Sequence, residues 1–274
     1  MSIHYAYDLC DAMEYFAEGQ PPLPEHTELL YVGSYFCDRY YCSTSPRIWE
    51  ECFSVARDRG VAAVLVIPTP SQALLGTLKN QTHALMDAYG ELIQEVVVND
   101  SGMLEWVSAN YPRIGIWLGR TMDKELRDPR YCLPGIHGKL LEQVEHRWHN
   151  RWKILGVESD VTQLSPNDYP ISHYGLGIHV PFAYLTMGRI CEFGSIGLPA
   201  GEKFQLYRPC NRQCMSHWMW FEQNAQCFLK HGRAVYTPVF GELGETDSAN
   251  IRMIESVFAA KVGTTCPGEK GESL

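Results

Sequence analysis

The chain has 274 residues, ten cysteines and a formal net charge of −9 at pH 7. That length allows one large α/β domain or two small ones. The acidic balance disfavours a protein that grips nucleic acid on its own, because phosphate backbones are usually bound through an excess of Lys and Arg.

The first residues, MSIHYAYDLCDAMEYF, do not combine a basic stretch with a following apolar core. No apolar run approaches the ~20 residues that cross a bilayer. We therefore expect a cytoplasmic protein without a membrane span. In such a reducing compartment, cysteines serve metals or chemistry rather than disulfides.

Short apolar runs alternate with helical patterns through the first half of the chain. The runs predict strands, and the periodic segments between them predict helices. The predicted strands are 2–6, 28–33, 62–67, 95–100 and 113–118. The predicted helices are 7–17, one that Ser45 and Pro46 start, 72–89 and 103–109.

The second half of the chain is less regular. Its predicted strands are 157–164, 178–187 and 234–239, the last strand candidate. Its predicted helices are a long one with the stripe Leu141, Val144, Trp148 and Leu155, and a final one capped by Ser248 with Ile251, Ile254 and Phe258 inward. Residues 264–274 are expected to form a polar tail.

Most of the strand candidates, about eight in all, are continuous apolar runs followed by helices, a pattern that predicts a parallel sheet covered on both faces. Our first expectation is a closed (β/α)8 barrel of the TIM type, possibly irregular or incomplete, with residues 1–263 in a single domain. An open, doubly wound parallel sheet is the alternative, since periodicity alone does not distinguish the two.

The segment 186–227 is rich in cysteine, with Cys191, Cys210, Cys214 and Cys227. Cys210 and Cys214 lie among polar loop residues, where thiols close together can hold one soft metal centre. The alternative is that they are inert buried thiols, a description that suits Cys52 on a predicted helix better. We therefore favour a metal or cluster site.

The barrel hypothesis gives these cysteines a common location. Active sites of such barrels are built from the loops at the carboxyl ends of the strands. Cys37 follows the strand 28–33, Cys191 follows the strand 178–187, and Cys210 and Cys214 lie further along the same loop. We expect all four thiols on one rim, an arrangement suited to an iron–sulfur cluster.

Several segments of the chain form recognisable motifs: YVGSYFC at 31–37 with SPRIWEECFSVARDRGVAAVLVIPT behind it, VVVNDSG at 96–102, and MGRIC at 187–191 with Cys210 beyond it. These segments resemble the U32 (collagenase-like) peptidase family, in particular its UbiV-type members from ubiquinone biosynthesis. The resemblance extends in order over roughly residues 1–235, and each motif alone is moderately specific.

The resemblance implies a barrel-like protein with a 4Fe-4S cluster on four cysteines. Members of the UbiU and UbiV type form a heterodimer and take part in oxygen-independent hydroxylation of the ubiquinone ring. Other members hydroxylate RNA bases. By position, Cys37, Cys210 and Cys214 match cluster ligands of the UbiV type, and Cys191 matches the first cysteine of the wider family.

The family pattern is broken at one place. The wider family has a second cysteine seven residues after the first, where this chain has Leu198. Cys191 is our choice for the fourth ligand, followed by Cys227 and then Cys42. Peptidase activity is not expected, because no Ser-His-Asp order and no His-Glu-x-x-His pattern is present.

The leading functional hypothesis is a cluster-bearing subunit of an oxygen-independent hydroxylase that acts with a UbiU-like partner, with a quinone precursor as a possible substrate. The alternatives are a non-catalytic electron-transfer or scaffold protein, and an RNA-base hydroxylase, which the acidic balance disfavours. Secondary candidates near the site, each with an ordinary structural explanation, are Cys132, His217, Arg189, Arg208, Arg212, Asn99, Asp100, Trp218, Trp220 and Phe221. His146 and His149 fit a solvated helix face.

Overall fold

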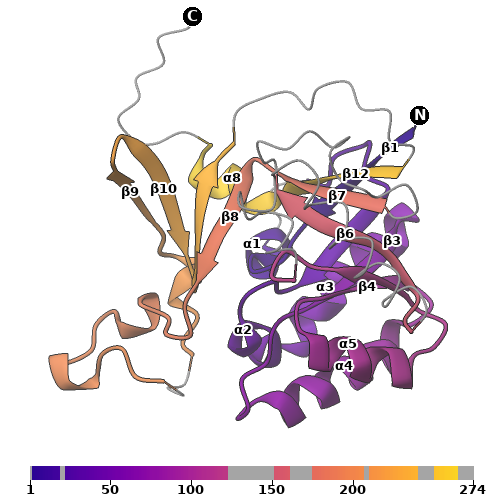
Figure 1. Cartoon of the computed structure of the whole chain (residues 1–274), viewed down its shortest axis with the longest axis horizontal. Coiled ribbons are helices and arrows are strands. Elements are labelled where there is room, and N and C mark those ends of the chain that lie inside the picture. The colour runs from indigo at the N-terminus through magenta and orange to yellow at the C-terminus, as the bar shows by residue number, and fades with distance from the viewer. Residues whose placement is uncertain are drawn as a thin grey trace, which may run out of the picture.

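The computed structural model describes residues 2–18, 22–122, 151–160, 175–206, 210–239 and 250–264. Eight parallel strands close into a barrel in the order β1-β12-β7-β6-β5-β4-β3-β2 (Figure 1). The strands are β1 (Ser2–Asp8), β2 (Leu29–Gly33), β3 (Ala62–Ile67), β4 (Ile93–Val98), β5 (Gly115–Leu118), β6 (Ile154–Asp160), β7 (Gly175–Val180) and β12 (Asn250–Ser256). The closed barrel is thus confirmed over the open sheet.

Helices cover the outside of the barrel. They are α1 (Met13–Ala17), α2 (Asp38–Ser43), α3 (Pro46–Arg59), α4 (Leu75–Tyr89), α5 (Ser101–Asn110) and α8 (Val257–Val262). The start of α3 follows the prediction, since the hydroxyl of Ser45 accepts the Ile48 N–H and Pro46 occupies the first turn. The apolar face of α3 is buried against the barrel, as its periodicity indicated.

The barrel interior is unusually polar. Arg252 of β12 pairs with Glu95 of β4 at 2.8 Å and donates to the Tyr31 hydroxyl at 2.7 Å. Its guanidinium lies 4.1 Å from the centre of the Trp117 ring. Trp117 fits because Gly156 and Gly175 face it: a Cβ at either position would come within 2.4 Å of the ring. A lumen with buried charges needs partners for them, and these pairs supply them.

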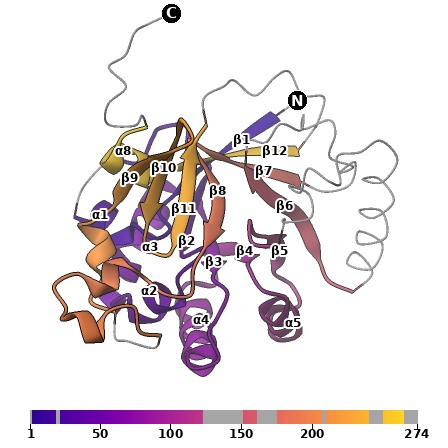
Figure 2. The same ribbon diagram turned by 60° about the vertical axis from the view of Figure 1, so that its left-hand side comes forward.

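A second sheet, which the sequence did not predict, stands beside the barrel (Figure 1, Figure 2). It is antiparallel in the order β8-β11-β10-β9. Its strands are β8 (Phe182–Met187), β9 (Met219–Gln223), β10 (Gln226–His231) and β11 (Ala234–Pro238). The predicted strand 178–187 is therefore wrong as one element. It divides at Pro181, which cannot donate to a ladder, and β7 stays in the barrel while β8 enters the second sheet.

The end of the chain also differs from the prediction. The predicted helix from Ser248 through Phe258 is wrong over most of its length, because Ile251 and Ile254 belong to β12, which closes the barrel against β1 and β7. Their three-residue spacing imitates a helix stripe. Segment 234–239 is not the last barrel strand either, since β11 pairs with β8 and β10.

Two further helix predictions need correction. Residues 7 and 8 continue β1, and the helix begins only at Met13. Leu155 lies in β6 rather than on the predicted long helix. The other residues of that stripe, Leu141, Val144 and Trp148, lie outside the described residues, as do Ser248, 161–164 and most of the predicted tail. In the part of the chain that is described, no helix has the length and apolar character that crossing a membrane requires.

Candidate functional site

One pocket between the barrel rim and the second sheet is lined by four cysteines. They are Cys37, Cys191, Cys210 and Cys214, the residues singled out from the sequence. The recess is open, and the space within it, solvent at its mouth included, is about 740 Å³. Cys37 comes from the loop after β2, whereas the other three come from the segment between β8 and β9, which projects beyond the end of the second sheet (Figure 1). The expected convergence of distant thiols is therefore present in the structure.

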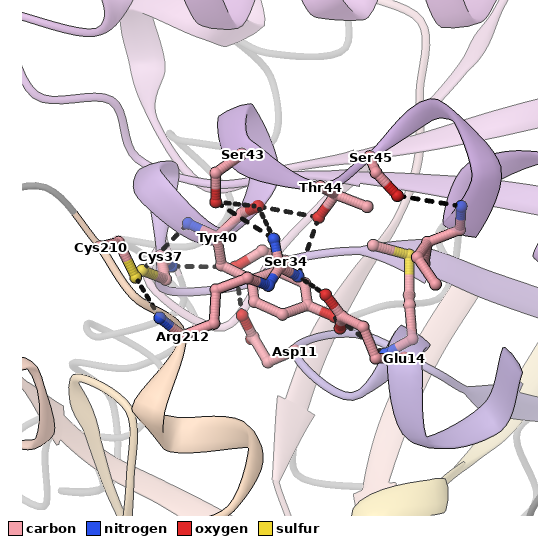
Figure 3. Close-up of polar contacts among 12 residues, drawn as sticks. Asp11, Glu14, Ser34, Cys37, Tyr40, Ser43, Thr44, Ser45, Cys210 and Arg212 are labelled. Carbon is pink, nitrogen blue, oxygen red and sulfur yellow. Dashed lines mark hydrogen bonds and ion pairs between the residues drawn. The ribbon is translucent and has the colours of Figure 1, made fainter. Parts of the chain in front are cut away.

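Cys37 is held at the start of α2. Its backbone N–H donates to the Ser34 hydroxyl at 2.9 Å, and that hydroxyl donates to Asp11 at 2.5 Å (Figure 3). The Cys37 sulfur accepts the Tyr40 N–H at 3.4 Å, in the position of a helix cap. Hydrogen bonds therefore fix both the backbone and the sulfur of Cys37.

Arg212 ties the Cys210–Cys214 loop to α2. Its backbone is left-handed (φ 58°), and its N–H donates to the Cys210 sulfur at 3.3 Å. Its guanidinium donates to Ser43 and Thr44 at 3.1 and 3.2 Å, and it forms an ion pair with Glu14 (Figure 3). The same group lies 4.2 Å from the centre of the Tyr40 ring. A planar guanidinium suits this combination of stacking and several bonds.

Two further contacts hold the second sheet to the thiol pocket. Arg233, in the turn after β10, pairs with buried Asp38 at 2.7 Å and donates to the Gly188 carbonyl at 2.9 Å. The His231 ring lies 3.0 Å from the Cys214 carbonyl, which accepts its N–H. Burial lowers the pKa of His231 to about 4, so this imidazole is neutral at physiological pH.

Burial favours the protonated form of three pocket thiols, Cys37, Cys210 and Cys214. It raises the pKa of Cys37 to about 12, and the charge of Asp11 adds to this while Arg233 opposes it. Burial also raises the pKa values of Cys210 and Cys214, and for Cys214 the other three thiols contribute in the same direction. Thiolates that share one pocket repel one another, so a bound cationic centre would favour their deprotonation.

The donor set of this pocket consists of four thiols. Within the described residues, no three His, Cys, Asp or Glu side chains are grouped closely enough to hold one metal ion. A four-iron cluster is larger and binds each of its thiolates at a different iron. Four thiols facing one pocket provide the soft ligands that such a cluster needs.

The other cysteines in the described part of the chain lie outside this pocket. Cys227, the reserve fourth ligand, is in β10 and is not among the free thiols. Cys42 packs on the core from α2, and Cys52 is buried in α3 as an inert thiol would be. Cys191 is therefore the fourth thiol that the described residues bring to the pocket, with its sulfur 3.7 Å from the Gly232 carbonyl. Its role as a ligand stays a prediction.

Most secondary candidates have ordinary structural roles. Asp100 caps α5 by accepting the Met103 N–H at 3.0 Å, and His217 is an exposed residue bonded to its neighbours. Arg189 lines the thiol pocket. The aromatic residues and Asn99 pack or bond within the fold: Trp218 on Phe258, Trp220 on Phe182, Phe221 on Phe228, and Asn99 on the Ile67 carbonyl. Cys132, His146, His149 and Arg208 lie outside the described residues.

Sequence reasoning missed a second recess, in the mouth of the barrel. Its lining includes Asp8, Arg120 and His179, all at or near the carboxyl ends of barrel strands. It shares Asp11, His231 and Tyr236 with the thiol pocket, so the two recesses adjoin. A polar residue shortly after an apolar strand, such as Arg120 two residues beyond β5, was the available signal.

Comparison with solved structures finds one similar fold. The chain matches the U32 peptidase Mk0906 with a TM-score of 0.50 and 14% sequence identity, and the match covers 92% of each chain. The two proteins share a fold. No family model and no curated protein matches the sequence. At this identity the likeness concerns architecture, and the barrel with its attached elements is thus an arrangement found in a U32 peptidase.

Proposed function

We propose that the protein is an iron–sulfur protein in which Cys37, Cys191, Cys210 and Cys214 hold a 4Fe-4S cluster. The observation that carries this proposal is that four free thiols, from segments more than 150 residues apart in the chain, line one pocket. Ordinary core packing does not require this, because the pocket is open rather than filled. When bound, the cluster would supply one-electron chemistry at the barrel rim.

The reaction that we propose is oxygen-independent hydroxylation in anaerobic ubiquinone biosynthesis, as in UbiV-type proteins. Support comes from the motifs around Cys37 and Cys191 and from a fold shared with a U32 peptidase. In this proposal the chain acts in a heterodimer with a UbiU-like barrel protein. The pocket itself lies at a barrel rim, where barrel enzymes place their chemistry.

A second candidate is an electron-transfer or scaffold protein. A protein that only carries electrons needs a cluster but no chamber for an organic molecule. The recess in the barrel mouth, which adjoins the thiols and is lined by buried ionisable groups, favours the hydroxylase subunit over this candidate.

Substitution of single thiols tests the proposal. Cys37→Ala, Cys210→Ala and Cys214→Ala should each abolish the electron paramagnetic resonance signal of the reduced cluster in anaerobically prepared protein. Cys42→Ala is the matched control, because Cys42 lies on the same helix that Cys37 caps but outside the pocket. Equal loss of signal in the control would mean a folding defect and would remove the evidence for specific ligands.

Quinone profiles test the pathway separately. A strain that lacks this protein should lose ubiquinone under anaerobic growth and keep it under aerobic growth. An unchanged anaerobic pool would contradict the ubiquinone assignment and leave the cluster proposal standing.

A further inference from the structure

The recess in the barrel mouth has the features of a ligand site that is distinct from the thiols. It is an open recess, and the space within it, solvent at its mouth included, is about 410 Å³. Its walls come from the ends of β1, β7 and β12, from the loops after β2 and β5, from α8 and from the second sheet. The residues that line it are Asp8, Cys10, Asp11, Tyr35, Arg120, His179, Val180, Phe182, His231, Tyr236, Ser256 and Phe258.

Two buried donors in this recess have no acceptor. The Arg120 side chain is 5% exposed, and its Nη1 pairs with Asp160 at 3.1 Å, but its Nε–H is unpaired among the described residues. Tyr35 is 1% exposed, and its hydroxyl also has no partner in the described part of the chain. Buried polar groups are normally satisfied, and exceptions indicate a missing partner such as a ligand. The partner would carry an acceptor oxygen.

The charges of the recess favour an uncharged ligand. The guanidinium of Arg120 is already paired with Asp160, and Asp8 also acts on it electrostatically. Asp11 lines the same recess. The positive charge of Arg120 is thus already balanced by Asp160, so no further negative charge is needed beside it, and a carbonyl oxygen can accept from its Nε–H.

The walls favour a ring. Tyr35, Phe182, Tyr236 and Phe258 line the recess together with two imidazoles. The Arg120 guanidinium lies 4.6 Å from the centre of the Tyr35 ring and 5.9 Å from that of Tyr236. Aromatic walls with a few directed polar groups are typical of sites for flat organic molecules.

We propose that the barrel mouth binds a small uncharged ring compound whose carbonyl oxygen accepts from Arg120 and Tyr35 and whose hydroxyl or amide hydrogen faces Asp8. The argument uses none of the four thiols, so it does not depend on iron. Because the two recesses share Asp11, His231 and Tyr236, a ligand held here would lie beside the thiol pocket.

Benzamide and benzoate form a matched pair of probes for this site. They have the same ring and shape, and they differ in charge and in the amide N–H group. Ligand-observed NMR titration of the full chain should show binding of benzamide and at least about tenfold weaker binding of benzoate, because Arg120 is already paired with Asp160 and the benzoate carboxylate would be buried without a charge partner of its own. Equal or tighter binding of benzoate would overturn the uncharged class, and absence of benzamide binding at millimolar concentration would overturn the site.

Tyr35→Phe tests the residues. The hydroxyl makes no bond within the described chain, so its removal should leave the melting temperature unchanged or slightly higher. The substitution should weaken the binding of benzamide by roughly three- to tenfold, because one hydrogen bond is lost. Tyr41→Phe is the control, since its hydroxyl bonds Thr82 outside the recess at 3.0 Å. Unchanged affinity in Tyr35→Phe would contradict the assignment of Tyr35.

Cys214→Ala separates this inference from the proposed function. If the variant lacks a cluster and still binds benzamide, the two sites are independent, as we infer. If benzamide binding is lost together with the cluster in a folded variant, the ligand site as described here is wrong and the thiol proposal is unaffected.

Discussion

Arg212 shows how a single side chain can hold the two parts of the thiol pocket in register. It joins the Cys210–Cys214 loop to the helix behind Cys37 through hydrogen bonds, an ion pair and ring stacking. Substitution of a residue that orients metal ligands without touching the metal typically weakens metal binding by roughly 10–100-fold. Arg212 has this role in our account.

We therefore predict that Arg212→Ala, loaded with iron, loses it to a chelator about tenfold faster than the unsubstituted protein. Arg212→Lys should be intermediate, because it keeps the charge but not the planar fork. Arg57→Ala is the control, since Arg57 forms only an exposed pair with Glu50 at 3.6 Å. Loss rates that are equal in all three variants would show that Arg212 does not position the ligands.

Glu158 provides a prediction about pH. Burial raises its pKa from 4.5 to about 8, while Tyr31 and Arg252 partly oppose this, and burial likewise raises the pKa of Asp8 to about 6. Between pH 4.5 and about 8, Glu158 keeps its proton in the folded protein and releases it in the unfolded chain. The resulting stabilisation is complete below pH 4.5 and is lost as the pH rises through 8.

The contribution of Glu158 should accordingly lower the melting temperature as the pH is raised from 5 to 9. Glu158→Gln keeps the shape of the protonated acid and does not ionise. Its melting temperature should therefore fall less over this range, and at high pH the variant should be more stable relative to the parent protein than at low pH. Thermal unfolding by circular dichroism measures this, with a scale of about 2–4 °C per kcal/mol. Parallel pH profiles for the two proteins would mean that Glu158 is ionised in the fold.

At the scale of elements, Gly33 at the end of β2 is where the chain turns toward Cys37. Its φ is 128°, and a Cβ there would lie 2.2 Å from the Val66 carbonyl oxygen. Gly60 at the end of α3 is also left-handed, with φ 67°, but a Cβ would meet nothing within 4 Å. Alanine at Gly60 would therefore add backbone strain alone, whereas alanine at Gly33 would add both strain and a steric clash.

Gly33→Ala should destabilise the protein by about 3 kcal/mol or more, since strain and a backbone clash combine. Gly60→Ala should cost only about 1 kcal/mol. Chemical denaturation of both variants measures the difference. Similar costs would show that β2 and β3 can separate enough to admit a methyl group.

The elements that sequence predicted well are those whose local pattern agrees with the fold. The strand 62–67 has the predicted bounds, and α3 begins at the predicted cap. Errors occur where the wider fold decides. Ile251 and Ile254 have helical spacing but close the barrel as a strand, and nothing local to 182–187 indicates that β8 pairs with β11 rather than with a barrel strand.

The same distinction applies to the candidate site. The four pocket thiols were visible as cysteines after predicted strands and by resemblance to a known family. Arg120, Tyr35 and Asp8 were not, because their importance comes from barrel closure, which brings the ends of β1, β5 and β7 together. Their individual positions in the sequence carry no motif.

At the scale of the whole molecule, the barrel and the second sheet meet at the two adjoining recesses. The barrel supplies Cys37 and the polar mouth, and the β8–β9 segment supplies the other three thiols. The arrangement places a candidate redox centre beside a candidate chamber for an organic ring. This arrangement is the one on which our proposal of a hydroxylase subunit rests.

The central claim is that the four thiols hold iron, and the content of iron and acid-labile sulfide measures it most directly. Protein purified without oxygen should be brown and contain about four irons and four sulfides per chain. A colourless, folded protein that stays free of iron after anaerobic reconstitution with iron and sulfide would contradict the account.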